Sequence, residues 1–112
     1  MEKNEKLYDT SALIKLVVKQ GITRLSGYTT ILNVIEYPPA TTLGLNIVYP
    51  RRVDYELAFT WQLKLRRKGR PVPAIDLIVA AIAVNMDLQL VAVDEHFNWI
   101  AEIDSRLKVK SI

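Results

Sequence analysis

The chain has 112 residues, half of them hydrophobic and about a quarter charged, with no cysteine and one histidine, His96. These counts exclude a disulfide scaffold, thiolate zinc sites, a cysteine nucleophile and a metal site built from several histidines. The net charge of +3 conceals a segregation, because Arg51–Arg70 carries +5 and the other 92 residues carry −2. That segment is suited to a polyanionic partner.

The first quarter of the chain predicts a strand, a helix and a second strand. Lys6–Tyr8 begins a short apolar stretch, and Asp9-Thr10-Ser11 directly after it supplies side-chain oxygens that can cap a helix. Apolar residues then recur at helical spacing until Gly21, which suits a C-terminal stop. Ile22–Tyr28 predicts a second, weaker strand.

The middle of the chain predicts two helices on either side of an ambiguous segment. Thr29 or Thr30 caps a short helix that stops at Pro38-Pro39. Leu45–Tyr49 is either a third strand or a buried loop. Val53–Lys68 gives the longest helical pattern in the chain, and it is apolar on two faces.

Those two apolar faces have different expected roles. One contains Trp61, which we expect in the core rather than stacked on a nucleic-acid base. Its members are Val53, Leu57, Trp61 and Leu65. The other consists of Tyr55, Phe59 and Leu63. A helix cannot bury both faces against one sheet, so we expect this second stripe to contact another copy of the chain or a partner protein.

The last third completes an α/β pattern. Leu77–Met86 predicts a helix packed on several sides, opened by Asp76, and its apolar run is far too short to cross a membrane. Leu88–Val93 is typical of a parallel strand covered on both faces. A short helix or turn follows Asp94, and Leu107–Ile112 predicts an edge strand. The whole pattern predicts a three-layer α/β/α sandwich with a central, mostly parallel sheet of four to five strands.

Both the length and the N-terminus bear on how the protein is organised and where it acts. A chain of 112 residues predicts one domain, spanning residues 1–112. The first residues, MEKNEK, are charged and polar and lack the apolar core of a secretory signal. We therefore expect a cytoplasmic protein with no membrane partner.

Four acidic residues occupy unusual positions: Asp9, Glu36, Asp76 and Asp94. Asp9 and Asp94 directly follow predicted strands, and the carboxyl ends of parallel strands meet at one edge of a sheet. Asp76 begins a buried helix, and Glu36 falls on or beside the apolar stripe of its helix. Taken singly, each aspartate also fits a helix cap, and Glu36 also fits a solvated last turn. Taken together, they predict a site for a hard divalent cation.

These acids lie in four segments that resemble, in order, the motifs of PIN-domain ribonucleases: LYDTSALI, ILNVIE, IDLIVAAIA and LVAVDEHF. The resemblance extends over nearly the whole chain and is closest to the VapC-type toxins of prokaryotic toxin–antitoxin pairs. It implies a PIN-like fold and an endoribonuclease that cleaves RNA phosphodiesters with a metal-activated water. It also implies a VapB-like antitoxin as partner and a homodimer.

The same resemblance implies roles for individual residues. Mg²⁺ or Mn²⁺ would be held by the catalytic acids Asp9, Glu36, Asp76 and Asp94, of which Asp9 and Asp76 would be the most direct ligands. Ser11 matches a polar position of the family's site, whereas Thr10 is expected to cap the helix. Apart from the resemblance, His96 is a lone histidine that closely follows Asp94, and it is expected to be a surface or cap-adjacent residue rather than a general base.

The basic segment supplies candidates for binding the RNA backbone: Arg51, Arg52, Lys64, Arg66, Arg67, Lys68 and Arg70. The alternative is that these cations are a solvated helix end that complements the helix dipole.

Three other functions stay open. A non-catalytic PIN-like module that binds RNA or a partner is favoured by Ala92, where the family often has a polar residue, and by the short segment between Glu36 and Val53. A receiver-like signalling domain needs an acceptor aspartate after its third strand, where this chain has Tyr49-Pro50. A PIN nuclease of RNA processing has the same residues as a toxin, and an adjacent antitoxin gene would distinguish the two.

Overall fold

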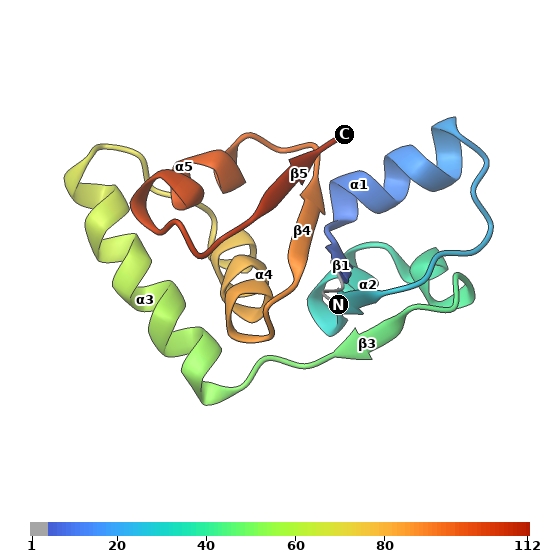
Figure 1. The fold of residues 1–112 in the computed structure, drawn as a ribbon, viewed down its shortest axis with the longest axis horizontal. Helices are drawn as coiled ribbons and strands as arrows, with labels where there is room; N and C mark the ends of the chain where they lie inside the picture. Colours follow the sequence, from blue (N-terminus) through green and yellow to red (C-terminus); the bar gives the residue numbers. More distant parts are fainter. Residues whose placement is uncertain (1–4) are drawn as a thin grey trace.

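A five-stranded sheet with all strands parallel forms the centre of the protein, seen in a computed structural model that describes residues 5–112 (Figure 1). The strands lie in the order β3-β2-β1-β4-β5. Their bounds are Lys6–Tyr8 for β1, Tyr28–Thr30 for β2, Asn46–Val48 for β3, Gln89–Ala92 for β4 and Val109–Ser111 for β5. The predicted three-layer α/β/α class with a mostly parallel sheet is therefore confirmed.

Helices cover both faces of this sheet. Their bounds are Thr10–Ile14 for α1, Ile31–Glu36 for α2, Arg52–Arg67 for α3, Ala74–Asn85 for α4 and His96–Ile103 for α5. A π-helical segment, Lys15–Lys19, continues α1, and a 3₁₀ segment, Pro38–Thr42, follows α2. Figure 1 shows α3, α4 and α5 on one side of the sheet and α1 on the other. Among the described helices, none combines the length and the apolarity that crossing a membrane requires.

The central strand β1 divides the core into two halves. Leu7 pairs with Leu90 of β4, and both side chains join the core beneath α3, α4 and α5. Tyr8 pairs with Val91, and both join the core beneath α1. This alternation follows from the pleat of a strand, in which successive side chains point to opposite faces. Because β1 and β4 run parallel in this register, the residues that follow them emerge at the same edge.

The second strand differs from the sequence prediction. Ile22–Tyr28 was expected to form it, but β2 begins only at Tyr28 and residues 22–27 form a loop. Gly27 stands at the junction with a φ of 126°, and a Cβ atom there would lie 2.7 Å from the carbonyl oxygen of Lys6. The strand propensity of the β-branched residues in this segment is therefore overridden by a turn that only glycine accommodates.

The other boundaries refine the predictions. Leu45–Tyr49, left open between strand and loop, contains the edge strand β3, and Thr30 rather than Thr29 caps α2. The helix expected to open at Asp76 begins two residues earlier, at Ala74, because Pro73 holds an extended conformation that precedes the first turn. Asp76 thus lies inside the first turn instead of capping it.

Helix α3 has the two faces that its pattern predicts. Trp61 and Leu65 are fully buried, and the indole Nε1 donates a hydrogen bond to Oδ2 of Asp104 at 3.0 Å. Val53, at the start of the same stripe, is exposed because it lies beyond the edge of the core. Tyr55, Phe59 and Leu63 are all exposed.

Shortening side chains on the two faces of α3 should have unequal effects on stability. Leu65→Ala removes a side chain with no exposed surface, whereas Leu63→Ala removes one that is 45% exposed. We expect Leu65→Ala to lower the free energy of unfolding by about 2–5 kcal/mol. Leu63→Ala should lower it by less than about 1 kcal/mol. Urea unfolding followed by circular dichroism measures both, and equal losses would contradict this placement of the core.

Candidate functional site

Asp9 lies directly after the central strand, and its carboxylate is almost completely buried, with 5% of the residue exposed. Its backbone N–H donates to the carbonyl oxygen of Val91, which ties it to the end of β4. Its side chain caps α1 by accepting hydrogen bonds from the Ser11 backbone N–H at 3.3 Å and the Ser11 hydroxyl at 2.9 Å. Ser11 Oγ also accepts a hydrogen bond from the backbone N–H of Val93 at 3.1 Å. Ser11 therefore orients Asp9 and links the ends of the two strands.

Thr10 has a different role from the cap that the sequence predicted. It lies inside the first turn of α1, so the capping position belongs to Asp9. The Thr10 hydroxyl donates a hydrogen bond to Oε1 of Glu36 at 2.5 Å, across from α1 to the end of α2. Thr10 thus positions a second acid instead of ending a helix.

Asn33 is a site residue that the sequence analysis missed. It is fully buried in α2, and its Nδ2 donates to Oδ1 of Asp9 at 3.2 Å and to Oγ1 of Thr10 at 2.9 Å. Its Oδ1 accepts a hydrogen bond from the Thr30 hydroxyl at 2.7 Å. The available signal was a polar side chain within the otherwise apolar ILNVI, three residues after the capping Thr30.

Glu36 does not intrude on the core as its spacing suggested. It is exposed at the last position of α2, where the helix reaches the rim of the sheet, and Asn33 takes the inward-facing position of the same helix. The side chain is still directed to the site through the hydrogen bond from Thr10.

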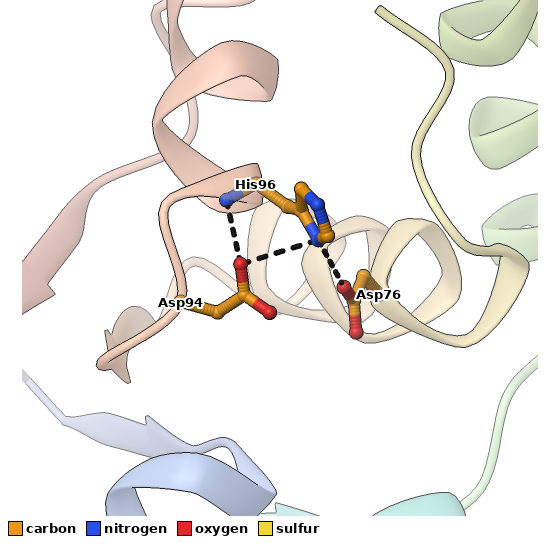
Figure 2. A group of neighbouring side chains, drawn as sticks. All are labelled: Asp76, Asp94 and His96. Atoms are coloured by element: carbon orange, nitrogen blue, oxygen red, sulfur yellow. Dashed lines mark hydrogen bonds and ion pairs between the residues drawn. The ribbon is translucent and has the colours of Figure 1, made fainter.

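A second group of side chains meets on the other side of the carboxyl edge of the sheet and consists of Asp76, Asp94 and His96 (Figure 2). His96 Nδ1 lies 3.2 Å from Oδ2 of Asp76 and 3.2 Å from Oδ1 of Asp94. The backbone N–H of His96, at the start of α5, donates to Oδ1 of Asp94 at 2.8 Å. In the described part of the chain, these three residues place potential ligand atoms within 4.8 Å of one another.

His96 is therefore more than the surface or cap-adjacent residue that the sequence predicted. Its backbone lies at the start of a helix as expected, but its side chain is only 33% exposed and its ring lies between two carboxylates. The sequence gives no direct sign of this association, because Asp76 and His96 are 20 positions apart and only the packing of α4 against α5 joins them.

The carboxylates of the site influence one another electrostatically. Burial, together with the negative charges of Asp9 and Asp94, raises the pKa of Asp76 to about 6, against the hydrogen bond from His96, which lowers it. Burial also raises the pKa of Asp9, against the hydrogen bonds from Ser11, and the charge of Glu36 adds to this increase. The four acids thus form a connected series of like charges, although Asp9 and Glu36 lie outside the tight group around His96.

The basic candidates separate into two groups at opposite ends of α3. Arg51 and Arg52 lie at its start and form ion pairs with Asp54 at 3.7 Å and Glu56 at 3.0 Å. The remaining cations lie at or just after its end: Lys64, Arg66, Arg67, Lys68 and Arg70. A helix of 16 residues is about 24 Å long, so the two groups cannot act as one patch.

The basic residues at the end of α3 border an open hollow of about 390 Å³, which is lined by Lys64, Arg67, Lys68, Glu102 and Ile103. Arg70 is partly engaged, because it forms an ion pair with Glu102 at 3.1 Å and lies 5.4 Å above the ring of Trp99.

No protein-family model and no curated protein match the sequence. Solved structures do match its fold. A member of the VapBC family of toxin–antitoxin systems, VapBC-5 from Mycobacterium tuberculosis, matches with a TM-score of 0.77 at 16% identity, over 98% of this chain and 100% of that one. DNA-bound VapBC from Salmonella typhimurium matches with a TM-score of 0.71 at 15% identity, over 97% and 98% of the two chains. VapBC-1 from nontypeable Haemophilus influenzae matches with a TM-score of 0.68 at 16% identity, over 95% and 96%.

These matches extend over nearly the whole length of each chain. The protein therefore has the PIN-like fold of VapC-type toxins, and the resemblance of the four sequence motifs to that family is confirmed at the level of the fold. At this identity, the match assigns neither an activity nor the role of any residue.

The raised pKa of Asp76 makes stability depend on pH in a defined direction. Between pH 3.8 and about 6 the folded chain binds more protons at Asp76 than the unfolded chain, so stability falls as the pH rises through this window. Replacing Asp76 with Asn removes the penalty of the buried charge. In EDTA at pH 7.5, Asp76→Asn should raise the free energy of unfolding by about 1–2 kcal/mol.

Urea unfolding at pH 7.5 and at pH 3.5 tests this expectation, because most of the gain should disappear at the lower pH, where Asp76 is protonated in the folded state and largely protonated in the unfolded state. An Asp76→Asn variant that is less stable than the parent protein at pH 7.5 would contradict it.

Proposed function

We propose that the protein is a Mg²⁺- or Mn²⁺-dependent endoribonuclease of VapC type, which hydrolyses RNA phosphodiester bonds as the toxin of a toxin–antitoxin pair. The observation that carries this proposal is the meeting of acids from four separate chain segments at the carboxyl edge of one parallel sheet. Burial, with a further contribution from the neighbouring carboxylates, raises the pKa of Asp76 to about 6, so the arrangement is costly without a cation.

The donor set fits a hard divalent cation. Asp9 is oriented by Ser11 and Asn33, yet each carboxylate oxygen keeps lone pairs beyond these hydrogen bonds. The side chains of Asp76 and Asp94 are 19% and 39% exposed, so both remain accessible from solution. We propose Asp9 and Asp76 as the most direct ligands, with Glu36 and Asp94 completing the pocket. A bound divalent cation supplies positive charge that lowers the pKa of water and offsets the charge of a reacting phosphate.

The surrounding residues hold these acids in place. Ser11 and Asn33 fix both oxygens of Asp9, and Thr10 directs Glu36 toward the site. Ala92 leaves no polar side chain two residues before Asp94, but Ser11 satisfies the backbone at the neighbouring Val93. This preorganisation supports a catalytic centre over a purely structural cluster, because the acids are held by donors and not dispersed into solvent.

The basic end of α3 is the better candidate for holding the RNA backbone. In Figure 1 the end of α3 and the carboxyl end of β4 lie toward the same, upper end of the molecule, whereas the start of α3, which carries Arg51 and Arg52, lies at the lower end. We therefore propose Lys64, Arg66, Arg67 and Lys68 as phosphate contacts, with Arg70 as a partly engaged neighbour.

The exposed stripe of α3 is the candidate protein contact. Tyr55 and Phe59 border an open apolar hollow of about 220 Å³ between α3 and the start of α4. We propose that this stripe, with Leu63, contacts a second copy of the chain or a VapB-like antitoxin. The solved structures that share the fold are of toxin–antitoxin systems, which supports a partner of this kind.

Removing one carboxylate charge from the site should abolish metal-dependent RNA cleavage. We expect Asp9→Asn and Asp76→Asn each to lower Mg²⁺- or Mn²⁺-dependent cleavage by at least about 100-fold, with the fold retained. A fluorescent single-stranded RNA, incubated with each ion or with EDTA, gives the rate. Asp87→Asn is the matched control, because Asp87 is exposed beyond the other end of α4 and its φ of 57° suits asparagine. Full activity of both site variants would overturn the proposal. If neither the parent protein nor the control variant cleaves RNA, a non-catalytic module is favoured.

Neutralising the basic end of α3 should weaken RNA binding without affecting the metal. We would change Arg66, Arg67 and Lys68 to Gln in the Asp9→Asn background. This change should reduce RNA affinity, and it should reduce the magnitude of the negative slope of the log association constant against log salt concentration by about 2. Fluorescence anisotropy at salt concentrations from about 50 to 200 mM measures both quantities. Arg52→Gln, at the opposite end of α3, should change neither, and an unchanged slope in the triple variant would exclude this surface as the RNA path.

A further inference from the structure

A nitrogen donor lies within the proposed acidic centre. Figure 2 shows Nδ1 of His96 turned toward Asp76 and Asp94, with the other ring nitrogen turned away from both. Nδ1 lies 3.2 Å from one oxygen of each carboxylate. The ring also lies against Trp99, with the ring centroids 5.3 Å apart. The start of α5 and this aromatic contact therefore hold the imidazole in one orientation.

These separations suit ligands that share an ion. Two adjacent ligands of an octahedral ion, each about 2.1 Å from the centre, are about 3.0 Å apart. Both Nδ1–oxygen distances are close to this value, so small displacements of the three side chains are sufficient for joint coordination. With Nδ1 as the ligand, the imidazole proton occupies the ring nitrogen that faces away from the carboxylates.

The chemistry of the nitrogen then discriminates between ions. Mg²⁺ strongly prefers oxygen ligands, whereas imidazole suits divalent first-row transition ions, whose affinities for N/O sites rise from Mn²⁺ onward. We propose that this centre binds a divalent first-row transition ion, with Mn²⁺ as the representative, in preference to Mg²⁺, and that His96 Nδ1 is the ligand that sets the preference. This inference rests on the proposed function, in which the same acids form the metal centre.

Direct detection of a metal–nitrogen bond tests the inference without any mutation. His96 is the only histidine in the chain, so in untagged protein an imidazole coupled to bound Mn²⁺ must come from this residue. We would load metal-free protein with one equivalent of Mn²⁺ and record pulsed electron paramagnetic resonance, once at natural abundance and once with uniform ¹⁵N. The expected result is a directly coordinated imidazole nitrogen whose signal changes with the isotope.

A binding experiment then measures the preference. Loss of the free Mn²⁺ signal during titration gives the Kd of Mn²⁺, and displacement by Mg²⁺ gives the Kd of Mg²⁺. We expect His96→Gln to weaken Mn²⁺ binding by roughly tenfold or more. Its Mg²⁺ affinity should be unchanged. Asp76→Asn is the matched comparison, because loss of a carboxylate should weaken the binding of both ions.

The outcomes distinguish this inference from the function on which it rests. Bound Mn²⁺ without imidazole coupling, or a parent protein that binds Mg²⁺ as tightly as Mn²⁺, overturns the role of His96 and leaves the metal-dependent nuclease intact. A His96→Gln variant that binds both ions more tightly also overturns it, because the ring would then compete with the ion for the carboxylates. If neither Mn²⁺ nor Mg²⁺ binds, both proposals are overturned.

Discussion

The burial of carboxylates that lie close together at the end of a parallel sheet is the constraint on which the rest of this site depends. Because β1 and β4 are neighbours and parallel, Asp9 and Asp94 emerge at one edge, and the packing of α4 brings Asp76 to the same place. Burial and neighbouring charge raise the pKa values of Asp9 and Asp76. The fold tolerates this cost because buried donors hold Asp9 and an imidazole lies between Asp76 and Asp94. A protein that maintains such an arrangement gains most from it when a cation is bound.

The basic and acidic residues that are unevenly distributed along the sequence are also separated in the folded structure. The basic segment does not act as a unit, because its first two arginines pair with acids on their own helix and its later cations gather about 24 Å away at the other end. Asp54 has a structural role, because it accepts hydrogen bonds from the backbone N–H of Arg51 and from Nδ2 of Asn85. What remains is an acidic edge and a basic helix end, which together match a metal ion and a polyanion.

Local pattern was sufficient for most of the fold but only for part of the site. Strand β1 and helix α3 follow from short-range periodicity and from residues that end elements, so their bounds were predicted closely. Strand β2 was misplaced because its start depends on the close approach of Gly27 to the backbone of Lys6, a contact between segments 21 residues apart. Asn33 and His96 were missed as site residues for the same reason. Their significance lies in partners on other elements, which no periodicity in a single sequence reveals.

A crystal structure of the protein grown with Mn²⁺, with diffraction data collected on both sides of the manganese absorption edge, decides whether the acidic edge is a divalent-cation centre. We predict an anomalous peak between Asp9 and Asp76, within coordinating distance of at least one carboxylate oxygen from each. A crystal saturated with Mn²⁺ whose anomalous map has no peak at this edge, or whose peaks lie only elsewhere on the surface, would contradict it.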